Sequence, residues 1–148
     1  GCCVRFVAGA IPPQESLATT QSWLGGDTDL DASGITCSAT TTEEKSMYDQ
    51  ATAAHSLSSR MRVFFVSSFS GYSAAGFSRP PYCSGGNYVN HVILGNSTND
   101  TDDLAHEFGH ILLNSGNHST NNQDLMFDTN VRGTNLSPSD CGTIYGNA

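Results

Sequence analysis

The spacing of apolar and polar residues predicts a helix in the first half of the chain. Thr41 followed by Glu44 forms a capping box, in which side chains at a helix start bond to backbone N–H groups that have no partner inside the helix. Apolar residues then recur on one helix face, at Met47, Ala51 and Ala54. We therefore expect an amphipathic helix from about Thr42 to Leu57 that packs one narrow apolar face.

Short runs of β-branched and aromatic residues predict the strands. Val4–Ala8 is one such run, and Met61–Phe69 is the densest, which indicates a buried central strand. Tyr72–Phe77 precedes two prolines, and prolines keep a strand away from the centre of a sheet, so any strand here lies at an edge. Tyr88–Leu94 is the next predicted strand, and the glycine- and aspartate-rich segment Gly25–Gly34 is a predicted loop.

These elements predict an α+β fold, with a twisted mixed sheet and a helix near residue 103 that lies across it. We find no internal repeat and no linker in the 148 residues. A chain of this length fits one domain. The sequence therefore predicts one domain over residues 1–148.

Composition excludes several classes of partner. The chain has 6 Lys plus Arg against 14 Asp plus Glu, a net charge of −8, so nucleic acid and anionic membranes would repel it. No run approaches the roughly 20 apolar residues of a membrane helix. Its polar surface is dominated by neutral Ser, Thr and Asn, a composition that suits an extracellular protein. We expect a soluble, secreted protein whose signal peptide or propeptide lies outside this sequence.

Five cysteines are spaced widely and form no CxxC pair: Cys2, Cys3, Cys37, Cys83 and Cys141. This spacing argues against a thiolate zinc site and for up to two disulfides with one thiol left over. The pairing stays open at the level of sequence.

Three aspartates at alternate positions resemble the start of a calcium loop: Asp27, Asp29 and Asp31. Ala32 replaces the glycine that such a loop needs, and Ser38 occupies the position of its closing glutamate. We therefore favour a solvated acidic turn, with Ca²⁺ binding as the alternative.

The clearest chemical signal is the segment Asp103–Leu113, in which His106, Glu107 and His110 read HExxH within a helical pattern. Side chains at i and i+4 stand one above the other on a helix face. The two histidines can therefore offer two imidazole nitrogens to one zinc ion, while the glutamate reaches a water on that ion as a general base. This arrangement predicts hydrolysis of a peptide bond.

The motif also occurs by chance, so its surroundings matter. The same helix carries apolar residues beside the motif, at Leu104, Phe108, Ile111 and Leu112. Burying two histidines and a glutamate in such a face is costly unless a partner such as a metal ion compensates. The context therefore favours a metal site.

A catalytic zinc ion usually has three protein ligands and one open position. Asn114 or Gly116 can end the helix in a left-handed backbone conformation, which turns the chain back toward the metal. His118 follows this turn and is the predicted third ligand. The alternative is a solvent-facing loop histidine.

The stretch from His106 to Phe127 resembles the active site of the metzincin zinc endopeptidases, and most of all the matrixins. In matrixins the third histidine is followed by Ser-Thr and then by a Leu-Met pair that forms the Met-turn. Here Met126 follows His118 at the same separation, 126 − 118 = 8. The resemblance implies that the three histidines bind zinc, that Glu107 is the base and proton shuttle, and that Met126 is the hydrophobic floor beneath the metal.

The resemblance reaches over roughly Tyr72–Gly146. It implies an edge strand that pairs with the substrate, a pocket wall from Phe127 to Arg132 and a short C-terminal helix over Leu136–Gly146. The substrate-binding residues that it implies are Tyr72, Ser73, Ala74 and Ala75. One feature departs from the family: the third histidine follows the second by 118 − 110 = 8 residues instead of six, and Leu113 stands where metzincins have a glycine.

Two other interpretations stay open. In an aspzincin-like arrangement, Asp140 replaces His118 as the third ligand. Alternatively, the chain is a secreted module that binds zinc without catalysis, although a purely structural site needs no base such as Glu107. We expect a secreted, monomeric zinc endopeptidase, made as a zymogen, that cleaves protein or peptide substrates.

Overall fold

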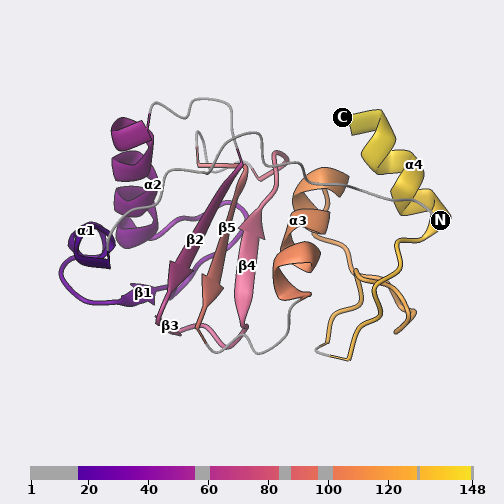
Figure 1. Cartoon of the computed structure of the whole chain (residues 1–148), viewed down its shortest axis with the longest axis horizontal. Coiled ribbons are helices and arrows are strands. Elements are labelled where there is room, and N and C mark those ends of the chain that lie inside the picture. The colour runs from indigo at the N-terminus through magenta and orange to yellow at the C-terminus, as the bar shows by residue number, and fades with distance from the viewer. Residues whose placement is uncertain (1–16, 56–60, 84–87, 97–101, 130, 148) are drawn as a thin grey trace.

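The computed structural model describes residues 17–55, 61–83, 88–96, 102–129 and 131–147. These residues form a mixed α+β fold with small sheets and four helices (Figure 1). The helices are α1 (Leu17–Trp23), α2 (Thr42–His55), α3 (Asp103–Leu113) and α4 (Pro138–Asn147). The strands are β1 (Asp29–Asp31), β2 (Arg62–Val66), β3 (Ser68–Ser70), β4 (Gly76–Arg79) and β5 (His91–Gly95).

The main sheet has three strands in the order β2-β5-β4. Strand β5 runs parallel to β2 and antiparallel to β4, so the sheet is mixed. All five residues of β5 are buried, as expected for a strand that is covered on both faces. Strands β1 and β3 form a separate parallel pair.

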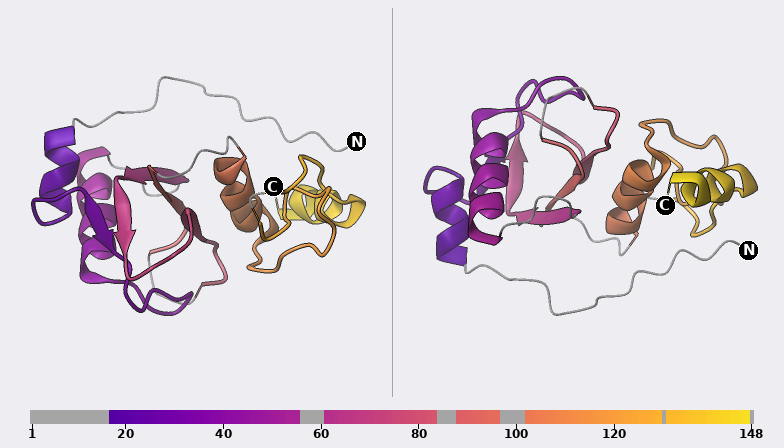
Figure 2. Two further views of the ribbon diagram at one scale, coloured as in Figure 1. Left: turned by 90° about the horizontal axis from the view of Figure 1, so that it is seen from below. Right: turned by 90° about the horizontal axis from the view of Figure 1, so that it is seen from above.

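The two faces of β5 contribute to two different cores. Ile93 packs with Met47 and Tyr48 of α2, whereas Val92 and Leu94 pack with Ile111 of α3. Helices α1 and α2 therefore lie on one side of the sheet and α3 on the other, with α4 beyond α3 (Figures 1 and 2). This arrangement places the helix that carries HExxH against β4 and β5.

Helix α2 confirms the predicted helix within the described residues. The backbone N–H of Glu44 donates to Oγ1 of Thr41 at 3.2 Å, so one half of the capping box forms. The glutamate side chain, however, does not return to the helix start. It points into the core, where its carboxylate accepts hydrogen bonds from Arg79 (2.7 Å) and from Nε2 of His91 (3.0 Å).

This buried ion pair joins α2 to the sheet. Arg79 also donates to the backbone carbonyls of Thr36 and Ala39, so one guanidinium holds both the helix and the loop before it. Burial, the largest single effect, would raise the pKa of Glu44, but the hydrogen bonds from His91 and Arg79 and the charge of Arg79 together hold it below its ordinary value. Burial lowers the pKa of His91, which therefore donates as a neutral imidazole.

The prediction of one buried central strand over Met61–Phe69 is wrong. The run divides into β2 and β3, which belong to different sheets, and β2 is an outer strand while β5 is central. The division falls at Ser67, whose N–H donates to Thr28 at 2.8 Å and so leaves the β2 ladder. The predicted loop Gly25–Gly34 likewise contains β1, because Leu30 is completely buried between two exposed aspartates.

The edge strand lies later than the sequence predicts. It is β4 (Gly76–Arg79), so Tyr72–Ala75 precedes the strand and only the end of Tyr72–Phe77 belongs to it. Strand β5 begins at His91, three residues inside the predicted Tyr88–Leu94. Helix α4 corresponds to the predicted C-terminal helix. The predicted strand Val4–Ala8 lies outside the described residues.

Cys37 and Cys83 form a disulfide, which ties the loop before α2 to the segment after β4. Cys141 is also disulfide-bonded, and Cys2 and Cys3 lie outside the described residues. Among the helices described, none is long and apolar enough to cross a membrane.

Candidate metal centre

Helix α3 presents the HExxH residues toward the sheet and ends where the sequence predicts. It runs from Asp103 to Leu113, and Asn114 then adopts a left-handed conformation with φ 50°. The amide oxygen of Asn114 accepts a hydrogen bond from the backbone N–H of Tyr82 at 2.6 Å, which anchors the turn to the segment after β4. This turn directs the following loop back toward the helix.

Two backbone carbonyls fix the first pair of histidines. Nδ1 of His106 donates to the carbonyl of Leu125 at 2.7 Å, and Nδ1 of His110 donates to the carbonyl of Ser115 at 2.9 Å. A carbonyl oxygen can only accept, so each Nδ1 carries the proton. Each Nε2 is therefore left with a lone pair, which is the form of imidazole that binds metals.

These two Nε2 atoms face each other at 3.1 Å. Two lone pairs at that distance repel unless a cation lies between them. Protonating one ring is unfavourable, because burial lowers the pKa of His106 and lowers that of His110 to about 4. Nitrogens that share a tetrahedral zinc ion at about 2.0–2.1 Å stand about 3.3 Å apart. The observed pair therefore fits a bound metal ion.

His118 completes a cluster with the first two histidines. The ligand atoms of the three residues all lie within 4.8 Å of one another. Its ring stacks on that of His106, with the ring planes 9° apart and the centroids 5.3 Å apart. Its Nε2 lies 3.5 Å from a carboxylate oxygen of Asp128. The three histidines are thus close enough to hold one metal ion.

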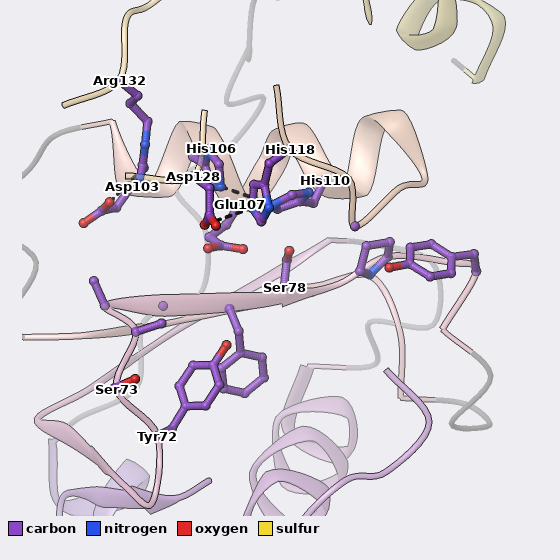
Figure 3. A pocket seen from close by; sticks show the side chains of 17 residues that line it. Tyr72, Ser73, Ser78, Asp103, His106, Glu107, His110, His118, Asp128 and Arg132 are labelled. Carbon is purple, nitrogen blue, oxygen red and sulfur yellow. Dashed lines mark hydrogen bonds and ion pairs between the residues drawn. The ribbon is translucent and has the colours of Figure 1, made fainter. Parts of the chain in front are cut away.

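Glu107 lies between α3 and β4, on the sheet side of the histidines (Figure 3). Ser78 of β4 points from the sheet toward the same space below α3 (Figure 3). Burial raises the pKa of Glu107 to about 7, although Ser78 and the charge of Arg132 act in the opposite direction. A carboxylate with a pKa near neutrality is suited to accept and release a proton.

A cleft with a volume of about 530 Å³ opens onto the three histidines and Glu107. All four residues that the resemblance assigns to substrate binding line it, namely Tyr72, Ser73, Ala74 and Ala75. They do so as an irregular segment and not as a strand. The ring of Tyr72 also packs edge-on against Phe69 and Phe77, so it contributes to the core as well as to the cleft wall.

Met126 lies in a turn that packs directly against α3. Its side chain is 2% exposed, and a Cβ added at Gly109 would collide with its Sδ. The carbonyl of the preceding residue, Leu125, is the acceptor that orients His106. The turn therefore touches the histidine cluster through its backbone and helix α3 through the side chain of Met126.

Sequence reasoning missed several contributors to this centre. Ser78 has no local pattern that distinguishes it from other strand serines. Arg132 ends the predicted pocket wall, but its bond to Asp103 at 2.9 Å, which links that wall to the start of α3, was not predicted. An acidic residue in the first turn of the helix was the available signal. Asp128 falls in the predicted wall segment, but nothing in the sequence indicates its contact with His118.

The other candidate ligands do not join the cluster. Among the described residues, the histidines are the group placed to hold a metal, and Asp140 of α4 is not part of it. The aspartates of the segment for which Ca²⁺ binding was the alternative interpretation do not converge either. Instead, Asp27 and Asp31 accept backbone N–H groups two residues ahead, the usual use of aspartate in a turn.

The chain matches no known protein-family profile, no curated protein and no solved structure.

Proposed function

We propose that the protein is a secreted zinc-dependent endopeptidase. The observation that carries the proposal is the pair of unprotonated Nε2 atoms of His106 and His110, 3.1 Å apart, with His118 beside them. The lone pairs of these nitrogens repel one another at this distance unless a cation lies between them. The disulfide between Cys37 and Cys83 supports an extracellular location.

Zinc suits the donors better than other common metals. Three neutral imidazoles favour zinc over the hard cations Mg²⁺ and Ca²⁺, which prefer oxygen ligands. Three protein ligands also leave one position open to the cleft, as catalytic zinc sites require. A zinc ion held there supplies a Lewis acid that lowers the pKa of a coordinated water to about 7.

The chain's own residues supply the rest of the chemistry. Glu107 accepts a proton from the attacking water and passes it to the amine that leaves. Ser78 of β4 lines the same cleft as the glutamate and faces it from the sheet (Figure 3). The peptide carbonyl would lie over the histidine cluster, where a zinc ion held by the three histidines would stabilise its developing negative charge.

The substrate is an extended peptide. Strand β4 is the last strand of its sheet in the described structure, so one side of its backbone is unpaired and can form main-chain hydrogen bonds to a peptide. The segment Tyr72–Ala75 continues that edge along the cleft. Strand addition of this kind would fix the scissile bond relative to the histidines.

Cleavage of a peptide library tests the proposal. The zinc-loaded protein should cut internal peptide bonds, and a zinc chelator should stop the reaction until zinc is restored. Glu107→Gln should keep zinc but lower kcat by about 10²–10⁴-fold, because only the proton acceptor is removed. If the wild-type protein binds zinc yet cuts no more peptides than the Glu107→Gln variant does, it is a non-catalytic zinc module.

A further inference from the structure

The three histidines of the cluster are held in different ways. His106 and His110 each have a Nδ1 hydrogen bond to a backbone carbonyl, which fixes the ring. Within the described part of the chain, His118 has no such bond. Its polar side-chain contact among the described residues is the 3.5 Å approach of Asp128 to Nε2. Besides this contact and the stacking of its ring on His106, the orientation of His118 depends on its backbone.

That backbone is fixed through the next residue, Ser119. Its N–H donates to the carbonyl of Met126 at 2.8 Å, which joins the His118 loop to the turn beneath α3. Its hydroxyl donates to Oδ2 of Asp124 at 2.6 Å. The backbone and the side chain of Ser119 are thus both hydrogen-bonded to the segment 124–126, which also orients His106.

Asp124, which accepts this bond, is a buried carboxylate. Its side chain is buried, with 9% exposed, and no arginine, lysine or histidine pairs with it among the described residues. Its carboxylate accepts instead from Ser119 and from the amide of Asn121, at 3.3 Å. A buried carboxylate without a cationic partner is costly, so one expects it to be retained for the geometry that it imposes.

We propose that Asp124 is a positioning residue for the third metal ligand, acting through Ser119 on His118. The inference rests on the proposed metal centre but assigns a residue that the motif does not contain. Asp124 fixes the start of the loop, so the imidazole of His118 is already aimed at the other two before the ion binds. Without it the ion must order this loop at a cost in affinity.

A double-mutant cycle on zinc affinity tests this role. Zinc dissociation constants are measured by competition with a chromophoric chelator for the wild type, Asp124→Ala, His118→Ala and the double variant. We expect Asp124→Ala to weaken zinc binding by about 10–100-fold, as other residues behind metal ligands do. In the His118→Ala background, Asp124→Ala should weaken zinc binding by less than about 3-fold, because the imidazole that Asp124 positions is absent.

Two substitutions of Ser119 test the same contact with a smaller change to the core than Asp124→Ala. Ser119→Ala removes only the hydroxyl that reaches Asp124 and should weaken zinc binding in the same direction. Ser119→Thr keeps a hydroxyl at that position and should retain most of the affinity. Should Asp124→Ala fail to fold, this pair decides the question.

Cobalt substitution gives a readout that global destabilisation does not change. The visible absorption of Co²⁺ depends on its coordination geometry. Folded Asp124→Ala and Ser119→Ala should each shift the Co²⁺ spectrum toward that of His118→Ala, whereas Ser119→Thr should match the wild type.

Failure of this inference differs from failure of the proposed function. If the wild-type protein binds no zinc, the metal centre itself is wrong. If the wild type binds zinc but Ser119→Ala and folded Asp124→Ala bind it within about 2-fold as tightly, the positioning role is wrong. An equal loss from Asp124→Ala with and without His118 would also overturn it, since Asp124 would then act by another route.

Discussion

At the scale of single residues, the backbone decides what the histidines can do. The carbonyls of Leu125 and Ser115 take the Nδ1 protons of His106 and His110, so both Nε2 atoms are available to a metal. The sequence predicts that these histidines share a helix face. It does not reveal which nitrogen each will present, because the acceptors come from the loops that follow the helix.

Gly109 shows how close the turn at Met126 approaches α3. Gly109→Ala should lower the free energy of unfolding by about 1–3 kcal/mol, because the new methyl group collides with the methionine Sδ. Urea unfolding measures the change. Gly142 of α4 offers a matched control, since a Cβ there meets nothing within 4 Å. Gly142→Ala should be neutral or stabilise by up to about 1 kcal/mol; equal effects of the two substitutions would contradict the packing described.

At the scale of elements, helices α2 and α3 follow from local sequence, whereas the sheet does not and helix α1 was not predicted. Helix α3 depends on residues three and four apart, and so its start, its end at Asn114 and its shared face are predictable. The division between β2 and β3 depends on the bond from Ser67 to Thr28, a residue nearly forty positions away. Local periodicity contains no information about such a partner.

Helix α2 is fastened to the sheet by one buried carboxylate, Glu44. Glu44→Gln should cost about 3–5 kcal/mol at neutral pH, because it leaves the buried guanidinium of Arg79 without its charged partner. Glu43→Gln is the comparison: this neighbouring carboxylate is half-buried and accepts the backbone N–H of Asp31 at 2.6 Å. Glutamine keeps an oxygen that can accept the same bond, so the change should cost less than about 1.5 kcal/mol. Chemical denaturation of the two variants measures the difference.

Glu44 also makes the free energy of unfolding depend on pH. The pKa of Glu44 is lower in the folded protein than its ordinary value of about 4.3, so its contribution is fully present above about pH 5. As the pH falls through the folded pKa the carboxylate is protonated and the contribution disappears. The gap in stability between wild type and Glu44→Gln should therefore narrow on acidification from pH 6 to pH 3. A gap that stays constant or widens would show that this carboxylate is not the group responsible.

At the scale of the whole molecule, the cleft is built between the sheet and the C-terminal third of the chain. Helix α3 lies between them and supplies the histidines and Glu107, while the loop after it supplies His118 (Figures 1 and 3). The sequence identified these residues because a metal site restricts both residue type and spacing. It did not identify Ser78 or the bond from Arg132 to Asp103, because each depends on a contact between distant segments. It did not identify Asp124 either, whose bond to Ser119 lies within an irregular loop that has no periodic pattern.

The disulfide Cys37–Cys83 joins the loop before α2 to the segment after β4 across a separation of 46 residues. Replacing both cysteines by alanine should lower the free energy of unfolding by about 2–4 kcal/mol, since the unfolded chain gains conformational freedom. Substitution is preferable to a reducing agent because Cys141 is disulfide-bonded as well. An unfolding curve that matches the wild type would show that the bond does not stabilise the fold.

The most direct test of the central claim is an anomalous diffraction map, recorded at the zinc absorption edge, of crystals grown with zinc. The account predicts one zinc ion about 2.0–2.2 Å from Nε2 of each of His106, His110 and His118, with its remaining position open to the cleft. An ion bound by Asp140 while the ring of His118 points away, or no ion at these histidines at all, would contradict it.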